Sequence, residues 1–325
     1  MATCLLLLLT ILHLSVALVG SMVQPRVQLR LVLLEPQGRD CSQIWVDNPG
    51  AGSSIYTIQP EGANAPFQSP PTPTPGTDFA HSEHPPLTDE DVGTAMFANE
   101  KGPADQQGGR RWTSGLPPPS QVFCDMREDG GWTVIQRREW GTEQPLDFER
   151  CWQEYKQGFG DLGGDHWLGL QHISDLTSQP GLQPELSVDL QDVDNLTWWA
   201  HYDYFHVDKE DHFYRLSLGQ YSGNAGDAFR GSGDTDTQEG RAFSTLDRDH
   251  DSCEPCEDGT GVFTSCSRDR SGVGWWYSNC GQADLNKPWP GREGDPPSLH
   301  WATVSSEQAL RSIMLRVRTA QRQKA

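Results

Sequence analysis

Three aspartates recur every second residue in the stretch LDRDHD, at Asp247, Asp249 and Asp251. Carboxylates held this close repel one another unless a cation lies among them. Calcium is the hard, oxygen-seeking cation that proteins bind with such groups outside cells. The stretch is not an EF-hand, because Ser252 stands where that loop needs its sharp-turn glycine. By itself the stretch leaves two interpretations open, an acidic turn exposed to solvent and a calcium site.

The first twenty residues are an apolar run that ends in small residues. This pattern predicts a secretory signal peptide over residues 1–20, and an uncleaved membrane anchor is the alternative. No other apolar stretch in the chain reaches the roughly 18 residues needed to span a bilayer. We therefore expect a secreted, extracellular chain without a membrane span.

Cysteines are the second group of reactive side chains. Removal of the signal peptide takes away Cys4 and leaves seven: Cys41, Cys124, Cys151, Cys253, Cys256, Cys266 and Cys280. Export makes disulfides the default use of these thiols, and an odd number leaves one thiol free or in an intermolecular bond. Zinc is the alternative for Cys253 and Cys256, whose spacing also suits a metal.

The sequence offers no support for catalysis. It contains no HExxH, no GxSxG, no Walker loop and no GxGxxG after a strand. Its formal net charge of -20 argues against a nucleic-acid partner, because binding phosphates requires an excess of Lys and Arg.

The region between residues 60 and 119 differs in composition from the rest of the chain. It holds 12 of the 23 prolines and few large apolar residues. Such a segment buries too little surface to offset the entropy of ordering it, so we expect a disordered insert over residues 61–119. A mispredicted exon without function is the alternative.

Apolar alternation predicts strands, and one segment predicts a helix. The sequence FERCWQEYKQGF indicates a short amphipathic helix, with Phe148, Trp152, Tyr155 and Phe159 on one face. The paired residues Trp275 and Trp276 are expected in the core. Strands are expected at residues 27–36, 53–60, 130–138, 186–191, 196–207, 213–221 and 313–319. Strands and short helices mix without βαβ regularity, which predicts an α+β fold.

Nine ordered motifs resemble the fibrinogen C-terminal (fibrinogen-related) domain family, over about residues 38–60 and 121–319. They are GRDCSQIW, SSIYTIQP, VFCDMREDGGWTVIQRR, FERCWQEYKQGFG, HWLGL, YSGNAGDAF, FSTLDRDHD, GWWYSNC and ADLN. The resemblance implies a small N-terminal subdomain, a central antiparallel sheet with short helices, and a loop-rich C-terminal subdomain that carries the sites.

The resemblance also divides the chain. It implies a short segment at 21–37, a fibrinogen-like domain at 38–319 interrupted by the insert at 61–119, and a tail at 320–325. The insert then lies within a domain and is not a boundary between two.

Pairing of the cysteines is likewise implied by the resemblance. It pairs Cys41 with Cys124 and Cys266 with Cys280, while Cys253 and Cys256 resemble the additional close pair of angiopoietins. Cys151 is then the odd cysteine, and we expect a free thiol or a disulfide-linked dimer there.

For calcium, the resemblance implies side-chain ligands at Asp249 and Asp251 and backbone carbonyls a few residues later. Cys253 and Pro255 occupy those later positions, although SCEPC replaces the usual aromatic-x-Gly stretch of the family. Asp247 completes the set of candidate metal residues.

The family's ligand pocket, beside the second disulfide, is altered in this chain. Gly281 stands where fibrinogen's pocket has His, and Tyr277, Asn279 and Trp289 are the candidate pocket residues, with Tyr277 and Trp289 expected at the surface. Asn195 begins the permitted N-x-T acceptor, which predicts a glycan or, alternatively, an unused site.

These features favour a secreted, non-catalytic protein that resembles fibrinogen-like and angiopoietin-like ligands. It would engage an extracellular protein or receptor through its C-terminal loops, with a structural calcium ion. The alternative is a ficolin-like, calcium-dependent lectin for acetylated glycans. A lectin gains avidity from multivalency, and the chain has neither a collagen repeat nor a coiled coil to provide it.

Overall fold

The N-terminal part of the fold begins with a capped helix. A computed structural model describes residues 37–62, 120–231, 233, 236–258, 261–289, 299–304 and 310–321. Helix α2 (Cys41–Asp47) begins after Asp40, whose carboxylate accepts the backbone N–H of Gln43 over 2.8 Å. This is the N-cap interaction that satisfies a free donor at a helix start. The sequence patterns above did not predict α2, although Asp40 was an available signal.

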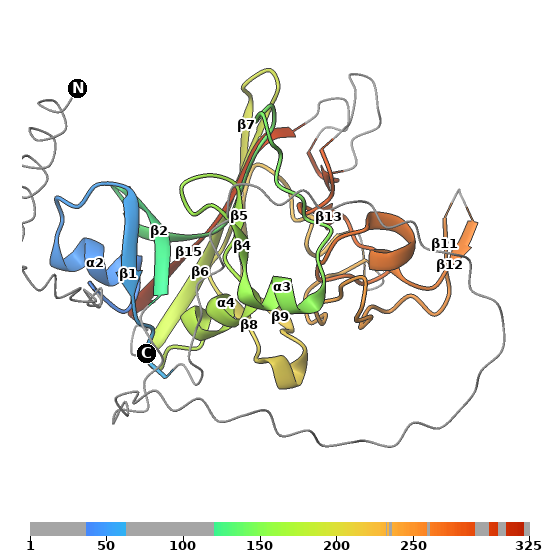
Figure 1. Cartoon of the computed structure of the whole chain (residues 1–325), viewed down its shortest axis with the longest axis horizontal. Coiled ribbons are helices and arrows are strands. Elements are labelled where there is room, and N and C mark those ends of the chain that lie inside the picture. The colour runs from blue at the N-terminus through green and yellow to red at the C-terminus, as the bar shows by residue number, and fades with distance from the viewer. Residues whose placement is uncertain are drawn as a thin grey trace, which may run out of the picture. The chain divides into compact units, whose positions relative to one another are not determined.

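A large antiparallel sheet forms the framework of the described residues (Figure 1). Its strands run in the order β1-β2-β3-β15-β6-β7-β10, and the short β4 and β5 join it through β3. Their bounds are β1 Ser54–Ile58, β2 Ser120–Arg127, β3 Gly130–Glu139, β4 Phe159–Gly160, β5 His166–Trp167, β6 Leu182–Asp192, β7 Thr197–Tyr202, β10 Tyr221–Gly223 and β15 Leu310–Gln321.

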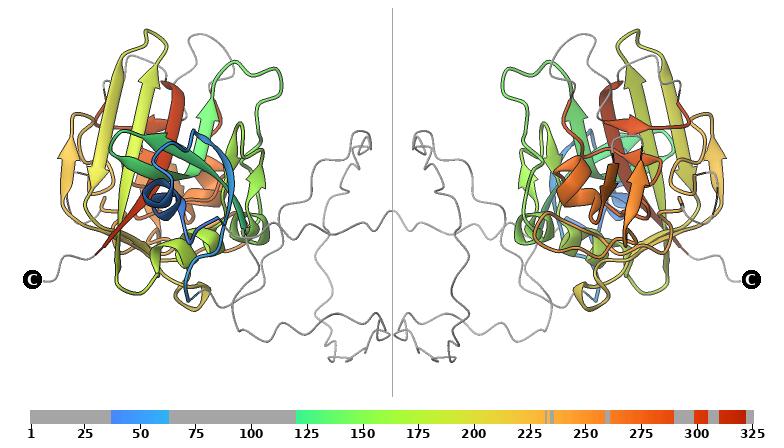
Figure 2. Two further views of the ribbon diagram at one scale, coloured as in Figure 1. Left: turned by 90° about the vertical axis from the view of Figure 1, so that its left-hand side faces the viewer. Right: turned by 90° about the vertical axis from the view of Figure 1, so that its right-hand side faces the viewer.

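The last strand of the chain lies inside this sheet. Strand β15 pairs with β3 on one side and with β6 on the other (Figure 2). Its alternating residues Ile313, Leu315 and Val317 are at most 1% exposed. The expected alternation at 313–319 is therefore confirmed, and the chain's C-terminal strand closes the core.

Two short helices lie next to each other beside the sheet: α3 (Trp152–Gln157) and α4 (Leu170–Thr177) (Figure 1). The predicted aromatic face is buried, with Phe148, Trp152, Tyr155 and Phe159 all at most 8% exposed. The predicted helix length was wrong, because Phe148 and Phe159 lie outside α3. Gly158, with φ 93°, ends the helix. Its backbone adopts a conformation that few residues other than glycine tolerate.

The C-terminal part is rich in loops and carries small two-stranded sheets. They pair β8 (Phe205–Val207) with β9 (Leu216–Leu218), β11 (Cys256–Asp258) with β12 (Gly261–Phe263), and β13 (Ala283–Asp284) with β14 (His300–Trp301). Short helical turns span η1 (Glu210–His212) and η2 (Ser267–Ser271). The single strands expected at 196–207 and 213–221 are each two strands in the structure.

Aromatic rings join the helices to the C-terminal part. The ring of Phe243 lies 5.2 Å from that of Tyr155 and 5.1 Å from that of Trp276, centroid to centroid. Trp275 and Trp276 are at most 1% exposed, which confirms their predicted place in the core. Gly274 permits this packing, because a Cβ there would lie 2.7 Å from Phe243 and Tyr155 atoms.

Several predictions concern residues outside the described ranges. The signal peptide over 1–20, the strand at 27–36 and most of the insert over 61–119 lie there, so they remain predictions. Within the described ranges, no helix combines the length and the apolar character that crossing a bilayer requires.

Candidate functional site

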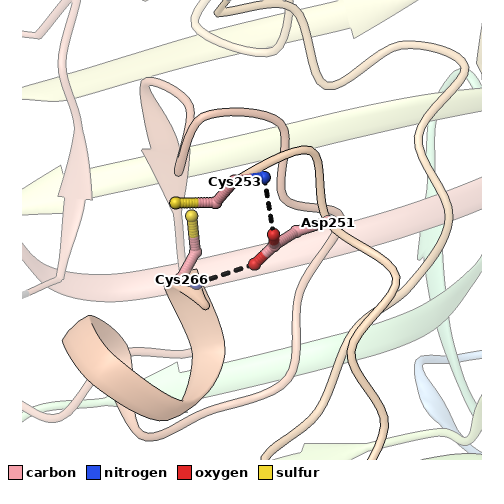
Figure 3. A group of neighbouring side chains, drawn as sticks. All are labelled: Asp251, Cys253 and Cys266. Carbon is pink, nitrogen blue, oxygen red and sulfur yellow. Dashed lines mark hydrogen bonds between the residues drawn. The ribbon is translucent and has the colours of Figure 1, made fainter. Parts of the chain in front are cut away.

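The acidic loop between β10 and β11 contains the predicted metal residues. Asp251 is half-buried, and its two carboxylate oxygens accept the backbone N–H groups of Cys253, over 2.8 Å, and of Cys266, over 2.7 Å (Figure 3). Burial, opposed by these two hydrogen bonds and assisted by the nearby charge of Asp249, raises the pKa of Asp251 to about 6. The loop thus holds Asp251 in a position where its negative charge is unfavourable.

Asp249 lies next to Asp251 on the exposed side of the loop. Its Oδ1 accepts the backbone N–H of Asp251 over 3.2 Å. Among the described residues, no Lys or Arg forms an ion pair with either carboxylate. The two acids therefore share a site whose negative charge is not balanced by a cationic side chain of the described protein.

Asp247, the third predicted metal residue, has other partners. Its Oδ1 accepts the backbone N–H of Trp152 over 2.8 Å and the hydroxyl of Thr245 over 2.8 Å. The structure therefore directs this carboxylate to the start of α3.

The cysteines pair as the resemblance implied. Disulfides join Cys41 to Cys124, Cys253 to Cys256 and Cys266 to Cys280. Cys151, the expected odd cysteine, is the free cysteine of the described residues, and it is partly buried. The sulfur atoms of Cys253 and Cys266 and a carboxylate oxygen of Asp251 lie within 4.8 Å of one another (Figure 3). Because both sulfurs are in disulfides, they offer no thiolate to a metal, and oxygen atoms remain the donors.

The three candidate pocket residues have different surroundings. Tyr277 is 1% exposed, and its hydroxyl donates to a carboxylate oxygen of Asp284 over 2.8 Å, so its expected place in a surface patch was wrong. Asn279 is exposed beside the disulfides, with its Oδ1 3.6 Å from the sulfur of Cys256. Trp289 is partly buried against the guanidinium of Arg138, 4.9 Å from its ring centroid.

The predicted glycan acceptor lies on the turn between β6 and β7. Asn195 is exposed and has φ 64°, and its Oδ1 accepts a hydrogen bond from Arg311 over 3.1 Å. An exposed turn is accessible to a modifying enzyme, so the glycan stays a prediction that the local geometry permits.

Two hollows of the described surface were not predicted from the sequence. One is a groove of about 620 Å³ across β2, β3, β15, β6 and β7, in which Arg316 pairs with Asp125 and Asp189. The other is a cavity of about 400 Å³ beside Arg138 and Trp289. Both join residues far apart in the chain, and no local sequence pattern signals such a juxtaposition.

Known proteins share this sequence and fold. Residues 114–319 match the family model for the C-terminal globular domain of fibrinogen beta and gamma chains. Fibrinogen C domain-containing protein 1 of Mus musculus is 44% identical over 176 residues, which cover 52% of this chain and 34% of that protein. Angiopoietin-4 of Homo sapiens is 42% identical over 174 residues, which cover 53% of this chain and 31% of that protein. The chain thus spans about a third of the length of these curated relatives.

Solved structures agree with these relatives. The fibrinogen-like globe domain of human ANGPTL2 has a TM-score of 0.58 at 30% identity, over 86% of this chain and 98% of that one. Lamprey fibrin D-dimer, complexed with the peptide Gly-His-Arg-Pro-amide, has a TM-score of 0.63 at 26% identity, over 100% of this chain and 87% of that one. The chain belongs to the fibrinogen C-terminal globular domain family and, within it, is related to non-catalytic angiopoietin-like proteins.

Proposed function

We propose that this chain is a secreted, non-catalytic binding protein that engages an extracellular protein or a cell-surface receptor through its C-terminal loops, with a structural calcium ion. The observation that carries the proposal is the uncompensated acid pair, Asp249 and Asp251, at the base of these loops. The angiopoietin relatives and the peptide bound to lamprey fibrin D-dimer support a protein or peptide partner.

The donor set of the acidic loop fits calcium. Each carboxylate oxygen that accepts one N–H keeps a second lone pair, so Asp251 can bind a cation while retaining its two hydrogen bonds. Asp249 would supply a second carboxylate, and the backbone carbonyls of Cys253 and Pro255 are proposed as neutral ligands. Calcium prefers such oxygen donors and tolerates irregular geometry.

A bound calcium ion would supply positive charge to the acid pair. The protein's own part is positional: Asp251 links the segment before β11 to Cys266 through its two hydrogen bonds. The hairpin of β11 and β12 follows directly and presents Val262, which is 67% exposed. The exposed apolar side chain of Val262 thus lies next to a segment that the hydrogen bonds of Asp251 hold in place. An exposed apolar side chain on a fixed loop is suited to contact a partner.

Calorimetric titration tests the calcium site. Secreted protein freed of metal is titrated with calcium, and we expect a dissociation constant on the order of 10⁻⁴–10⁻³ M, as in other extracellular modules. Asp249→Asn should weaken binding by about tenfold, because it removes one charge from the site. Asp211→Asn, at a side chain that is 74% exposed outside the loop, is the matched control and should bind as the wild type does. No heat up to millimolar calcium would end the calcium proposal.

Cell-surface binding tests the partner. The labelled chain, displayed as a bivalent fusion, is applied to a panel of cell types with and without calcium. Val262→Asp should abolish binding, whereas Val46→Asp, at a residue 63% exposed on α2, should leave it intact. Equal loss in both variants would contradict the proposed surface. Calcium-dependent binding to acetylated glycans instead of a protein would favour the lectin alternative.

A further inference from the structure

A second site lies outside the acidic loop, in the cavity of about 400 Å³ beside Arg138. One side is formed by the connection from β3 to α3, including Trp140, Leu146 and Phe148. Another is formed by Pro288 and Trp289, which follow β13. The volume lies at the lower end of the range of small-molecule sites, so it accommodates a small aromatic acid.

Arg138 provides the charge of this cavity. Its side chain is 2% exposed, and its guanidinium lies 4.2 Å from the ring centroid of Phe148 and 4.9 Å from that of Trp289. Cation–π contacts with two rings restrain the guanidinium. Burial lowers the pKa of Arg138 to about 10, so the group is still a cation at neutral pH.

The hydrogen bonds of Arg138 use one edge of the guanidinium. Its Nη1 donates to the backbone carbonyls of Leu285, over 2.9 Å, and Lys287, over 2.5 Å. Its Nε is buried and has no acceptor among the described residues, and the same holds for the indole Nε1 of Trp289. Buried donors without acceptors are costly, and the cost is greater for a charged group.

Nearby carboxylates only partly compensate this cation. Asp165 and Asp284 act on Arg138 through space, but Nη1 of Arg138 donates its hydrogen bonds to neutral backbone carbonyls. Burial raises the pKa of both acids, so each gains less from being ionised and is a weaker counter-ion. Asp147 lines the cavity, but its Oδ1 already accepts the backbone N–H of Glu149 over 2.8 Å.

We propose that this cavity binds the carboxylate of a ligand whose body is apolar or aromatic. A carboxylate matches the unused Nε edge of a guanidinium and supplies the counter-charge that the backbone carbonyls lack. Trp140, 40% exposed, and Leu146 offer apolar surface to the rest of the ligand. A dianionic phosphate fits less well, because it would bring a second negative charge next to Asp147, which lines the cavity. This site is independent of the proposed function.

The indole N–H of Trp289 is a direct reporter of binding. The full secreted chain, labelled with ¹⁵N, is titrated with phenylacetate, and Trp289→Phe identifies the resonance. We expect a saturable shift of this resonance with a dissociation constant on the order of 1 mM, as befits so small a ligand. Phenylacetamide has the same shape without the charge and should leave the resonance unchanged. A peptide with a free C-terminal Phe, compared with its amidated form, shows whether a chain end also enters.

Substituting Arg138 itself risks preventing folding, because the residue is buried. Variants of other residues that line the cavity therefore test the proposal. Trp140→Ala should weaken phenylacetate binding severalfold, and Asp147→Asn should strengthen it by removing a like charge. Trp199→Ala, at a residue 46% exposed on β7, is the matched control and should not change the affinity. The proposal is overturned if phenylacetate gives no saturable shift up to about 10 mM. It is also overturned if the amide shifts Trp289 equally, or if Trp140→Ala and Trp199→Ala bind alike.

Discussion

The Oδ1 atom of Asp247 accepts the backbone N–H of Trp152, the first residue of α3, over 2.8 Å. The same oxygen accepts the hydroxyl of Thr245, over 2.8 Å. A residue 95 positions along the chain therefore satisfies a free donor at the start of a six-residue helix. This hydrogen bond fastens the acidic loop to the aromatic core, because Trp152 is 1% exposed.

Removing this contact should destabilise the protein. We expect Asp247→Ala to lower the free energy of unfolding by about 1–2 kcal/mol, the usual cost of losing such a helix-start acceptor. Asp249→Ala, which removes an acid that accepts no donor from a helix start, should change it by less than about 0.5 kcal/mol without calcium. Urea unfolding in the presence of a chelator measures both. Equal losses would contradict separate roles for the two acids.

The Cys41–Cys124 disulfide should contribute more stability than the close pair. Its cysteines are 83 residues apart, whereas Cys253 and Cys256 are three apart. Loop-closure entropy then assigns about 4–5 kcal/mol to the long crosslink and roughly 2 kcal/mol to the short one. Paired Cys→Ser variants of each disulfide, compared by urea unfolding, measure the difference. A larger loss from the short crosslink would refute the entropic explanation.

Acid should destabilise the fold through a buried histidine on α4. Burial lowers the pKa of His172 to about 3, well below its usual 6.5. Below pH 6.5 the unfolded chain therefore binds a proton that the folded chain does not, so stability falls as pH falls. At pH 5.5 the loss from this one group is about 1.4 kcal/mol relative to neutral pH.

The variant His172→Gln isolates this contribution. Burial also lowers the pKa of His166, which adds to the acid sensitivity of both proteins. The difference in stability between neutral pH and pH 5.5 should therefore be smaller in His172→Gln by about 1.4 kcal/mol, as measured by urea unfolding. An unchanged difference would show that His172 does not take part.

Cys151 should be the reactive thiol of the folded protein. It is partly buried before α3, and its backbone N–H donates to the carboxylate of Glu154 over 3.2 Å. We expect one free sulfhydryl for each monomer after removal of residues 1–20, or a covalent dimer that Cys151→Ser abolishes. Non-reducing electrophoresis and thiol labelling check this. Only monomer without any free sulfhydryl would rule it out.

Much of the fold was accessible from the sequence. The alternation at 313–319 identified a buried strand face, because side chains of a strand alternate between its two sides. The aromatic spacing from Phe148 to Phe159 identified four buried side chains, of which Trp152 and Tyr155 lie on the helix. The ordered motifs identified the family and, through it, the three disulfides. Helix α3 was predicted too long, because Phe148 and Phe159 are buried by tertiary packing outside the helix.

The candidate site was harder to predict from the sequence than the fold was. Asp247 was grouped with Asp249 and Asp251 by spacing, but α3 supplies Asp247 with its own donor. Tyr277 was expected at the surface, but the buried Asp284 accepts its hydroxyl hydrogen. In both cases a polar group was satisfied by a partner distant in sequence or in the core, which spacing along the chain does not reveal.

The sequence by itself determined the family, the cysteine framework and the faces that are buried, because these follow from residue identity and local periodicity. The tertiary structure alone decided that β15 lies between β3 and β6, and that Arg138 meets Trp289 beside a cavity. Contacts between segments so far apart depend on the packing of the whole core. The hydrogen bonds and the charge state of a carboxylate or a guanidinium depend on the neighbouring groups that this packing places around it.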